Sequence, residues 1–202
     1  MDVKRVVVTG IGALTPIGNN VPQYWESLCS GVNGAATITR FDISKFKTNI
    51  ACEVKNFDPF NYFDKKEVKK LDLYAQYGIV AADEAITDAG INKNNTNYDE
   101  VGVIFSSGIG GITSFFEEVK SHCEGDGVPR FSPFIIPKLL PDITAGHISI
   151  KYGFRGPNFA IVSACASSAN SIIEGFHYIQ YGKFPVMIVG GAESAICPIG
   201  IG

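Results

Sequence analysis

The stretch Asn158–Asn170, NFAIVSACASSAN, runs from an apolar segment through one cysteine into a series of small residues. Asn158–Val162 is typical of a buried strand, and residues 166–182 have the composition of a helix. Cys165 is therefore predicted at the turn from a strand to a helix. Unpaired amides and the positive end of the helix dipole favour a thiolate there, whereas most buried cysteines are inert. These residues alone leave a nucleophilic and an inert Cys165 both open.

The segments on either side of this unit continue the alternation of strand and helix. Apolar, β-branched runs predict further strands at Val3–Thr9, Val101–Ser106 and Val186–Val189. Helices are predicted at residues 65–89, 112–123 and 143–152. Irregular structure is predicted at 35–63, with its aromatic side chains on the core, and a loop at 125–141. This order predicts a layered α/β domain with a largely parallel sheet.

Composition excludes several classes of protein. The chain of 202 residues has 17 basic and 20 acidic side chains, and the net charge of −3 argues against a global attraction to nucleic acid. No apolar run is long enough to span a bilayer, and the N-terminus resembles a strand more than a signal peptide. The five cysteines are odd in number and lack a C-x-x-C pattern, so neither a disulfide framework nor a metal site is predicted. Free thiols fit a reducing, cytoplasmic location.

Two glycine-rich turns follow predicted strands. Val6–Gly18 contains a Gly-x-Gly after a strand, but Thr15 stands where a dinucleotide-binding turn needs a third glycine. A tight structural turn is therefore favoured over NAD(P) binding, and no cofactor is expected. Ser107–Gly111 lacks the Lys-Ser/Thr of a Walker loop. A close backbone approach and the lining of a ligand pocket both stay open for this second turn.

A run of lysines opens the helix predicted at 65–89, at Lys65, Lys66, Lys69 and Lys70. Such a run is usually a solvated face. Basic side chains are poorly matched to the positive end of a helix dipole, which favours acids. That mismatch keeps an acidic docking partner open as the alternative.

The sequence offers no evident base for Cys165, although a thiol nucleophile usually needs histidine or another orienting partner. His147 lies in an apolar helical stretch and His177 lies three turns down the helix after Cys165, so both are predicted to be packed residues. The sequence ends ESAICPIGIG with no final helix. We therefore expect that the protein continues past Gly202 and that the missing catalytic groups lie there.

A set of motifs occurs in one order along the chain: RVVVTGIGALTPIGNN at 5–20, Gln76–Ala82, Ser107–Gly111, Ser132–Phe134, Ala145–His147, Tyr152–Pro157, Ser163–Ser167 and Gly190–Glu193. Together they closely resemble the N-terminal half of the β-ketoacyl-acyl carrier protein synthase II family, condensing enzymes of the thiolase superfamily. The resemblance covers essentially all of residues 1–202. It implies a thiolase-like α/β fold, in which this chain is the N-terminal half of an α-β-α-β-α layered structure with a mixed, largely parallel sheet. It also implies a homodimer.

The resemblance implies that Cys165 accepts an acyl group, with its backbone amide as half of an oxyanion hole. Malonyl-acyl carrier protein then loses CO₂ and attacks the acyl group, so that the chain grows by two carbons. The catalytic histidines and lysine of the family belong to its second half, so this chain alone is expected to be inactive. Ser168 and Asn170 depart from the common glycine and histidine, which leaves substrate preference open.

Further roles follow from the same resemblance. The acyl-pocket positions are Gly108, Ile109, Ala164, Phe134 and Ile135, the last two in a stretch that reaches the pocket of the partner subunit. Lys66, Lys69 and Lys70 match a basic patch that docks the acidic acyl carrier protein. The alternatives are a polyketide-type ketosynthase or a thiolase on the same fold, a non-catalytic chain-length partner subunit, and an NAD(P)-binding domain. The cysteine argues against the non-catalytic subunit.

Overall fold

A computed structural model describes residues 3–202 of the chain, which are built around a parallel sheet. Its strands are β3 (Val101–Ser106), β4 (Asn158–Phe159) and β5 (Val186–Gly191), in the order β4-β3-β5. β3 pairs with β5 along its whole length, from Val101 opposite Val186 to Ser106 opposite Gly191. All six residues of β3 are buried, as expected for a strand covered on both faces.

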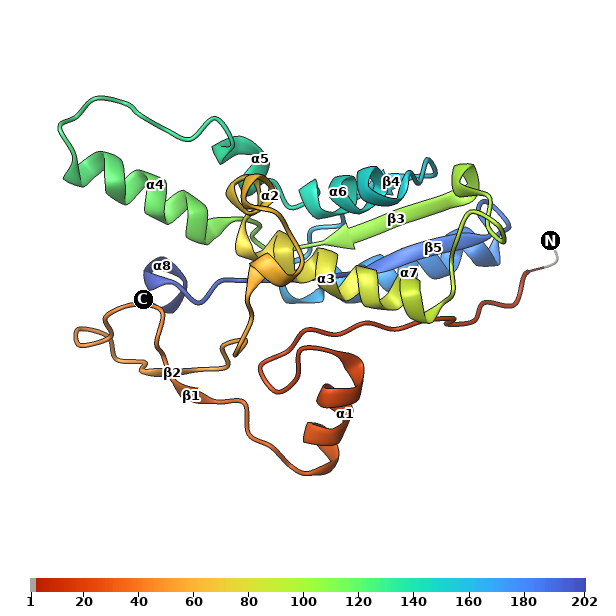
Figure 1. The fold of residues 1–202 in the computed structure, drawn as a ribbon, viewed down its shortest axis with the longest axis horizontal. Coiled ribbons are helices and arrows are strands. Elements are labelled where there is room, and N and C mark those ends of the chain that lie inside the picture. Colours follow the sequence, from red (N-terminus) through yellow and green to blue (C-terminus); the bar gives the residue numbers. More distant parts are fainter. Residues whose placement is uncertain (1–2) are drawn as a thin grey trace.

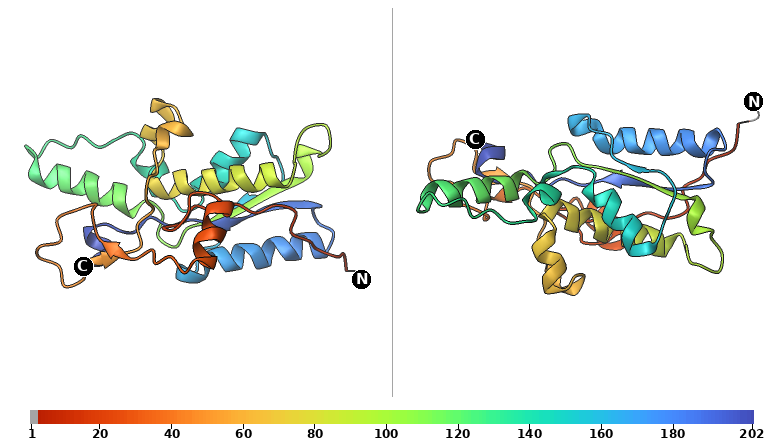
Figure 2. Two further views of the ribbon diagram at one scale, coloured as in Figure 1. Left: turned by 60° about the horizontal axis from the view of Figure 1, so that its bottom comes forward. Right: turned by 90° about the horizontal axis from the view of Figure 1, so that it is seen from above.

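Helices cover both faces of the sheet (Figure 1). Helix α7 (Ser167–Gln180) packs on one face, against β3 and β5. Helices α3 (Leu73–Asp88) and α6 (Ile143–Tyr152) pack on the other, as the view from above shows (Figure 2). The bounds of α6 and β3 are those predicted. The layered α/β arrangement with parallel strands is therefore confirmed.

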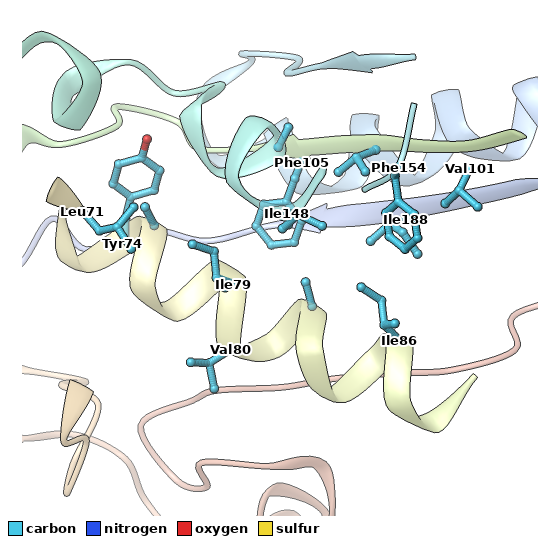
Figure 3. Packing of buried hydrophobic residues seen from close by; sticks show 14 of the residues in the cluster. Leu71, Tyr74, Ile79, Val80, Ile86, Val101, Phe105, Ile148, Phe154 and Ile188 are labelled. Atoms are coloured by element: carbon cyan, nitrogen blue, oxygen red, sulfur yellow. The ribbon is translucent and has the colours of Figure 1, made fainter. Parts of the chain in front are cut away.

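The core lies between α3, α6 and the sheet (Figure 3). Tyr74 and Ile86 of α3 belong to one cluster with Val101 of β3 and Ile148 of α6, and each is at most 2% exposed. The strand supplies a continuous apolar run, and the helices supply one apolar face each. Removal of these apolar side chains from water stabilises the fold.

The helix predicted at 65–89 is wrong in one respect, because it is two helices. α2 (Lys65–Lys70) begins with a capping box between Asp64 and Glu67. Leu71 is extended, and Asp72 then caps α3 by accepting a hydrogen bond from the Tyr74 amide at 3.1 Å. Each aspartate satisfies helix amides that would otherwise lack a partner, which stabilises two starts instead of one.

The strand predicted at Val3–Thr9 is also wrong. This segment runs beside β5 but forms no ladder with it, and the Lys4 amide donates instead to the Gln180 carbonyl of α7. An apolar cavity of about 180 Å³ separates residues 6–10 from β5, α3 and α7. Side chains at Gly10 and Gly12 would collide with the carbonyl oxygens of Ala85 and Ala81. The two glycines of the Gly-x-Gly pattern thus allow this segment to pack closely against α3, in agreement with the prediction of a structural turn.

The outer elements extend away from the sheet (Figure 1). They are α1 (Val21–Cys29), the antiparallel pair β1 (Ala36–Thr37) and β2 (Ile50–Ala51), α4 (Ile112–Glu124), α5 (Ile135–Leu139), α8 (Pro198–Ile201) and 3₁₀ turns at Pro59–Asn61 and Tyr98–Glu100. α4 begins where predicted, whereas the loop predicted at 125–141 contains α5. The aromatic side chains of residues 35–63 were predicted to lie on the core, and they differ in exposure. Phe63 is buried as predicted, but Phe60 is 58% exposed.

Within residues 3–202, none of the helices combines the length and the apolar character needed to cross a membrane.

Candidate active site

The carboxyl ends of the three parallel strands meet at one edge of the sheet, the usual place for ligands in α/β proteins. β3 ends at Ser106 and leads into the loop Ser107–Gly111. β5 ends at Gly191 and leads to Glu193, and the chain after β4 leads to Cys165. Three segments far apart in sequence therefore converge here.

Cys165 lies in a 3₁₀ turn, Ala164–Ala166, directly before α7, and its residue is exposed. Ala164 has φ of +52°, a left-handed conformation that non-glycine residues seldom adopt. This sharp turn presents the thiol in the manner of a nucleophile elbow. The strand predicted at 158–162 is only two residues long, and the helix predicted at 166–182 ends at Gln180.

Serine hydroxyls stabilise the turn around Cys165 by hydrogen bonds to its main chain. Ser167, which is 2% exposed, accepts from the Ser163 amide at 2.9 Å and donates to the Ala164 carbonyl at 2.7 Å. Ser106 accepts from the Ile161 amide at 2.9 Å and contacts the fully buried Ser171 hydroxyl. These bonds satisfy partly buried backbone groups and hold the left-handed turn in place. Sequence reasoning missed them, because single serines carry no local signal of such pairing.

The loop Ser107–Gly111 lies against the Cys165 turn, and Glu193 joins it to the end of β5. The Glu193 carboxylate accepts from the Gly108 amide at 2.7 Å, the Ile109 amide at 3.2 Å and the Ser107 hydroxyl at 2.9 Å. A Cβ at Gly108 would lie 2.9 Å from that carboxylate and 3.2 Å from the Ala164 carbonyl oxygen. Of the predicted pocket residues, Gly108, Ile109 and Ala164 are thus brought together.

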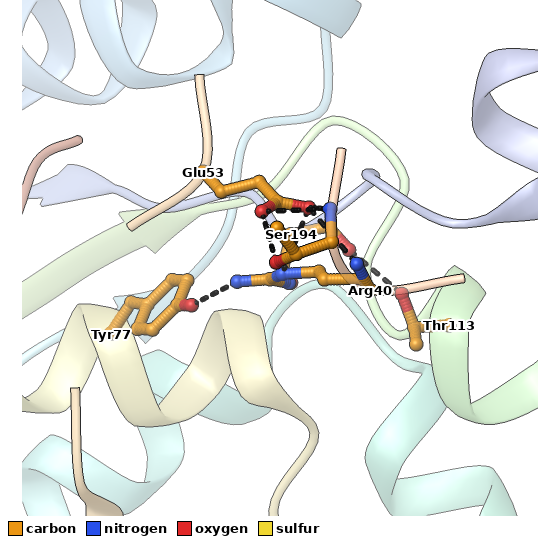
Figure 4. A network of polar contacts seen from close by, with 6 residues as sticks. Arg40, Glu53, Tyr77, Thr113 and Ser194 are labelled. Carbon is orange, nitrogen blue, oxygen red and sulfur yellow. Dashed lines mark hydrogen bonds and ion pairs between the residues drawn. The ribbon is translucent and has the colours of Figure 1, made fainter. Parts of the chain in front are cut away.

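The segment after Glu193 is fixed by a polar network (Figure 4). Arg40 donates to the Ser194 hydroxyl at 3.3 Å and to the Tyr77 hydroxyl at 2.6 Å. Thr113 donates to the Ser194 carbonyl at 2.9 Å. Burial raises the pKa of Tyr77 even though the Arg40 guanidinium opposes that change. The network connects α3 and α4 to the chain that carries Glu193.

Phe134 and Ile135 lie at the start of α5, away from the contact between Gly108 and Ala164. The Phe134 ring faces Lys70, whose Nζ lies 5.8 Å from the ring centroid. It is the other end of α5 that touches the loop, where the Gly111 amide donates to the Leu139 carbonyl at 3.3 Å. Contact of Phe134 and Ile135 with a partner subunit stays a prediction.

The lysines of α2 are all exposed. The prediction of a mismatch with the helix dipole is wrong for Lys69 and Lys70, because α2 ends at Lys70 and both lie in its last turn, where positive charge is favourable. Glu67 and the Asp64 cap meet the requirement for acidic groups at the helix start. The docking role of Lys66, Lys69 and Lys70 stays a prediction that rests on the family resemblance, and the three side chains lie exposed on one helix, as that role requires.

The histidines differ in their surroundings. His147 is half-buried in α6, and this burial lowers its pKa; the smaller effect of Glu67 raises the pKa, and that of Lys70 lowers it further. The prediction that His177 is packed is wrong: its side chain is 42% exposed, beside Glu174 and stacked on Tyr181. In the part of the chain that the structure describes, no group of three or more His, Cys, Asp or Glu side chains is arranged to hold a metal ion.

Comparisons with known proteins agree with this geometry. The family model described as beta-ketoacyl synthase, N-terminal domain, matches residues 3–202. The 3-oxoacyl-[acyl-carrier-protein] synthase 2 of Staphylococcus aureus strain N315 is 46% identical over 98% of this chain and 48% of that protein. The protein of the same name from Synechocystis is 41% identical over 98% of this chain and 48% of that protein. The chain therefore spans about half the length of the curated relatives it matches.

Two solved structures share the fold. The ishigamide ketosynthase/chain length factor matches with a TM-score of 0.88 and 26% identity, over 98% of this chain and 49% of that chain. A beta-ketoacyl synthase from Burkholderia phymatum STM815 matches with a TM-score of 0.83 and 25% identity, over 97% of this chain and 48% of that chain. The predicted thiolase-like fold class is confirmed.

Proposed function

Because this chain belongs to the β-ketoacyl synthase family, we propose that residues 1–202 are the N-terminal, acyl-accepting part of a longer 3-oxoacyl-acyl carrier protein synthase. One observation carries the proposal. Cys165 is exposed on a left-handed turn at the start of α7, directly beside the glycine loop after β3. This arrangement supplies a nucleophile. Next to it, Gly108 has no side chain and brings only main-chain atoms to the Cys165 turn.

The first half of the reaction is acyl transfer to Cys165. The thiolate attacks the carbonyl carbon of an acyl-carrier thioester, and a new C–S bond forms as the old one breaks. The carrier thiolate leaves and takes up a proton. The Cys165 amide, at the start of the helix, points a donor toward the developing oxyanion.

The second half of the reaction extends the chain. Malonyl-acyl carrier protein loses CO₂, and the electron pair of the broken C–C bond attacks the Cys165 thioester. The thiolate of Cys165 is released, and the 3-oxoacyl product stays on the carrier. The family resemblance assigns the groups that assist decarboxylation to the second half of the protein, so residues 1–202 alone give no condensation.

The acyl-transfer step is tested in the full-length protein by incubation with an acyl-acyl carrier protein. Intact mass and peptide mapping should place one acyl group on Cys165. Cys165→Ala should remove it and lower condensation by about 10³-fold or more. Cys52→Ala is the matched control, since Cys52 is also an exposed free thiol. Acylation that persists in Cys165→Ala contradicts the proposal.

The exposed lysines of α2 are proposed to dock the acidic acyl carrier protein, the partner that the names of the relatives print. The double variant Lys66→Glu with Lys69→Glu should raise KM for acyl-acyl carrier protein about tenfold, because surface charge governs encounter with a charged partner. KM for an acyl-pantetheine thioester should not change. Lys45→Glu with Lys47→Glu, also exposed, is the charge-matched control. An equal rise in both pairs contradicts docking at α2.

A polyketide-type ketosynthase is the second candidate, because the ishigamide ketosynthase shares the fold. The higher identity to the 3-oxoacyl-[acyl-carrier-protein] synthases, 46% against 26%, favours fatty acid synthesis. Saturated acyl chains should therefore be better substrates than polyketide intermediates. A preference for the latter reverses the choice. We also propose a homodimer for the full-length protein, which light scattering tests directly.

A further inference from the structure

Glu193 has an unusual set of partners for an exposed glutamate. Its two carboxylate oxygens accept three hydrogen bonds from consecutive residues of one loop, the Ser107 hydroxyl, the Gly108 amide and the Ile109 amide. The Ser107 hydroxyl in turn accepts from the Gly110 amide at 2.9 Å. A negative acceptor thus organises the turn from Ser107 to Gly110, either directly or through the Ser107 hydroxyl. Hydrogen bonds to a charged group are stronger than those between neutral groups.

The backbone around Glu193 is fixed independently of this loop. On one side, the Ala192 amide donates to the Ser106 carbonyl at 3.0 Å, as a continuation of the β3–β5 pairing. On the other side, Arg40 and Thr113 hold Ser194 (Figure 4). Since both neighbours of Glu193 are anchored to other elements, its carboxylate sets the position of the loop.

The loop in turn limits the space beside the nucleophile. Gly108 lies between the Glu193 carboxylate and the Ala164 carbonyl, and Ala164 precedes Cys165. The side chain of Ile109 is 51% exposed while its amide is held by Glu193. A shift of the carboxylate would therefore move the Ile109 side chain relative to Cys165.

We propose that Glu193 is a positioning residue that holds Gly108 and Ile109 against the Cys165 turn and so determines how the enzyme accommodates the acyl chain. The proposal rests on the proposed acyl transfer to Cys165. Glu193 acts through the loop and takes no part in the bond changes at the thioester. Loss of its carboxylate alters the dependence of the reaction on acyl length, not the reactivity of the thiol.

The test compares Glu193→Ala and Glu193→Gln in the full-length protein, with short, medium and long acyl-acyl carrier proteins. Glu193→Ala should raise KM for the preferred chain about tenfold and flatten the preference among lengths. The rate of Cys165 alkylation by iodoacetamide should stay within about twofold of wild type. Glu193→Gln keeps an oxygen for the two amides and should recover most of the preference. Amide exchange at Gly108 and Ile109 should be faster in the alanine variant.

Glu84 provides a matched control, because its carboxylate also holds a loop by main-chain amides. It accepts from the Ala13 amide at 2.9 Å and the Val21 amide at 2.8 Å. Glu84→Ala should lower Tm and leave the acyl-length profile unchanged. If Glu193→Ala does not fold, Glu193→Gln must still show the smaller, residual change in the acyl-length profile that loss of the negative charge leaves, together with faster amide exchange at Gly108 and Ile109.

Two negative results are distinguishable. Wild-type protein that forms no acyl-Cys165 overturns the proposed function, and the role of Glu193 with it. If the wild type is active and both Glu193 variants keep the wild-type acyl-length profile, only the positioning role is overturned. If the Glu193 variants lose activity equally for all chain lengths, as a merely destabilised Glu84→Ala would, the positioning role is also overturned.

Discussion

The two ends of the central sheet use polar groups differently. At the amino ends of the strands, side chains contact side chains: Tyr152 stacks on Phe154 with ring centroids 5.3 Å apart, and its hydroxyl donates to Asp83 at 2.8 Å. At the carboxyl ends, Glu193 and Ser167 also hold main-chain amides of two turns, at Gly108 and at Ser163. The first arrangement closes the core, whereas the second fixes an exposed turn. Substitutions at the carboxyl ends should therefore change the reaction more than they change stability.

The strongest test of this contrast is the same substitution at two glycines. In Gly108→Ala the new Cβ would meet the Glu193 carboxylate and the Ala164 carbonyl, so the carboxylate that holds the loop, or the loop itself, must shift. Because small displacements near reacting groups cost up to about 10²-fold in rate, we expect kcat/KM to fall about tenfold or more. Gly146 of α6 has open space around its Cβ position, so Gly146→Ala should keep full activity and raise stability by up to about 1 kcal/mol. Equal activity of the two variants would contradict a special role for the loop at the carboxyl ends of the strands.

A smaller effect on activity is expected for Ser167→Ala. Loss of the hydroxyl leaves the Ser163 amide and the Ala164 carbonyl without this partner, which costs about 1–3 kcal/mol of unfolding free energy. The Ala164 turn should relax, and acylation of Cys165 should slow about tenfold. Ser171→Ala, one helical turn further, should show a similar loss in urea unfolding with near-normal acylation. If Ser167→Ala acylates Cys165 at the wild-type rate, the hydrogen bonds of Ser167 are not needed to hold the Ala164 turn.

The contrast also separates what sequence can and cannot predict. Val101–Ser106 and Ile143–Tyr152 were predictable because a buried strand and a packed helix each have a local apolar pattern. The break at Leu71 had a local signal too, the capping residue Asp72, which the apolar stripe obscured. Cys165 was singled out by its place between strand and helix, and the family resemblance supplied its predicted role as the acyl acceptor. Glu193 was not, because its partners are 84 to 86 residues away and follow from strand order alone.

Val3–Thr9 illustrates the opposite failure. Its β-branched composition fits a strand, but strand formation requires a partner edge within hydrogen-bond distance. In the structure an apolar cavity lies between this segment and β5, and its amide at Lys4 pairs with α7. Local propensity therefore predicted neither the ladder nor the burial of this segment, since Val3, Val7 and Val8 are 60%, 57% and 82% exposed.

At the amino ends, Tyr152→Phe should affect stability only. The phenol loses its hydrogen bond to Asp83, which still pairs with Lys151, so the loss is about 1 kcal/mol. Ring stacking on Phe154 is kept. Urea unfolding should show the loss, and kcat/KM should match that of wild type. A fall in kcat/KM larger than that of Ser167→Ala would break the distinction between the two ends.

The smallest expected effect concerns His147 in α6, the helix that runs between the two ends. Burial lowers its pKa from 6.5 in the folded state, so the unfolded chain binds more protons near that pH. Stability from neutral His147 is thus complete above about pH 6.5 and is lost as the pH falls toward the lower folded pKa, with a slope of at most about 1.4 kcal/mol per pH unit. Replacement by a side chain that never ionises, His147→Gln, should flatten this part of the stability curve without a change in acylation of Cys165. NMR titration of the imidazole reads the folded pKa directly, and a midpoint at or above 6.5 would contradict the burial argument.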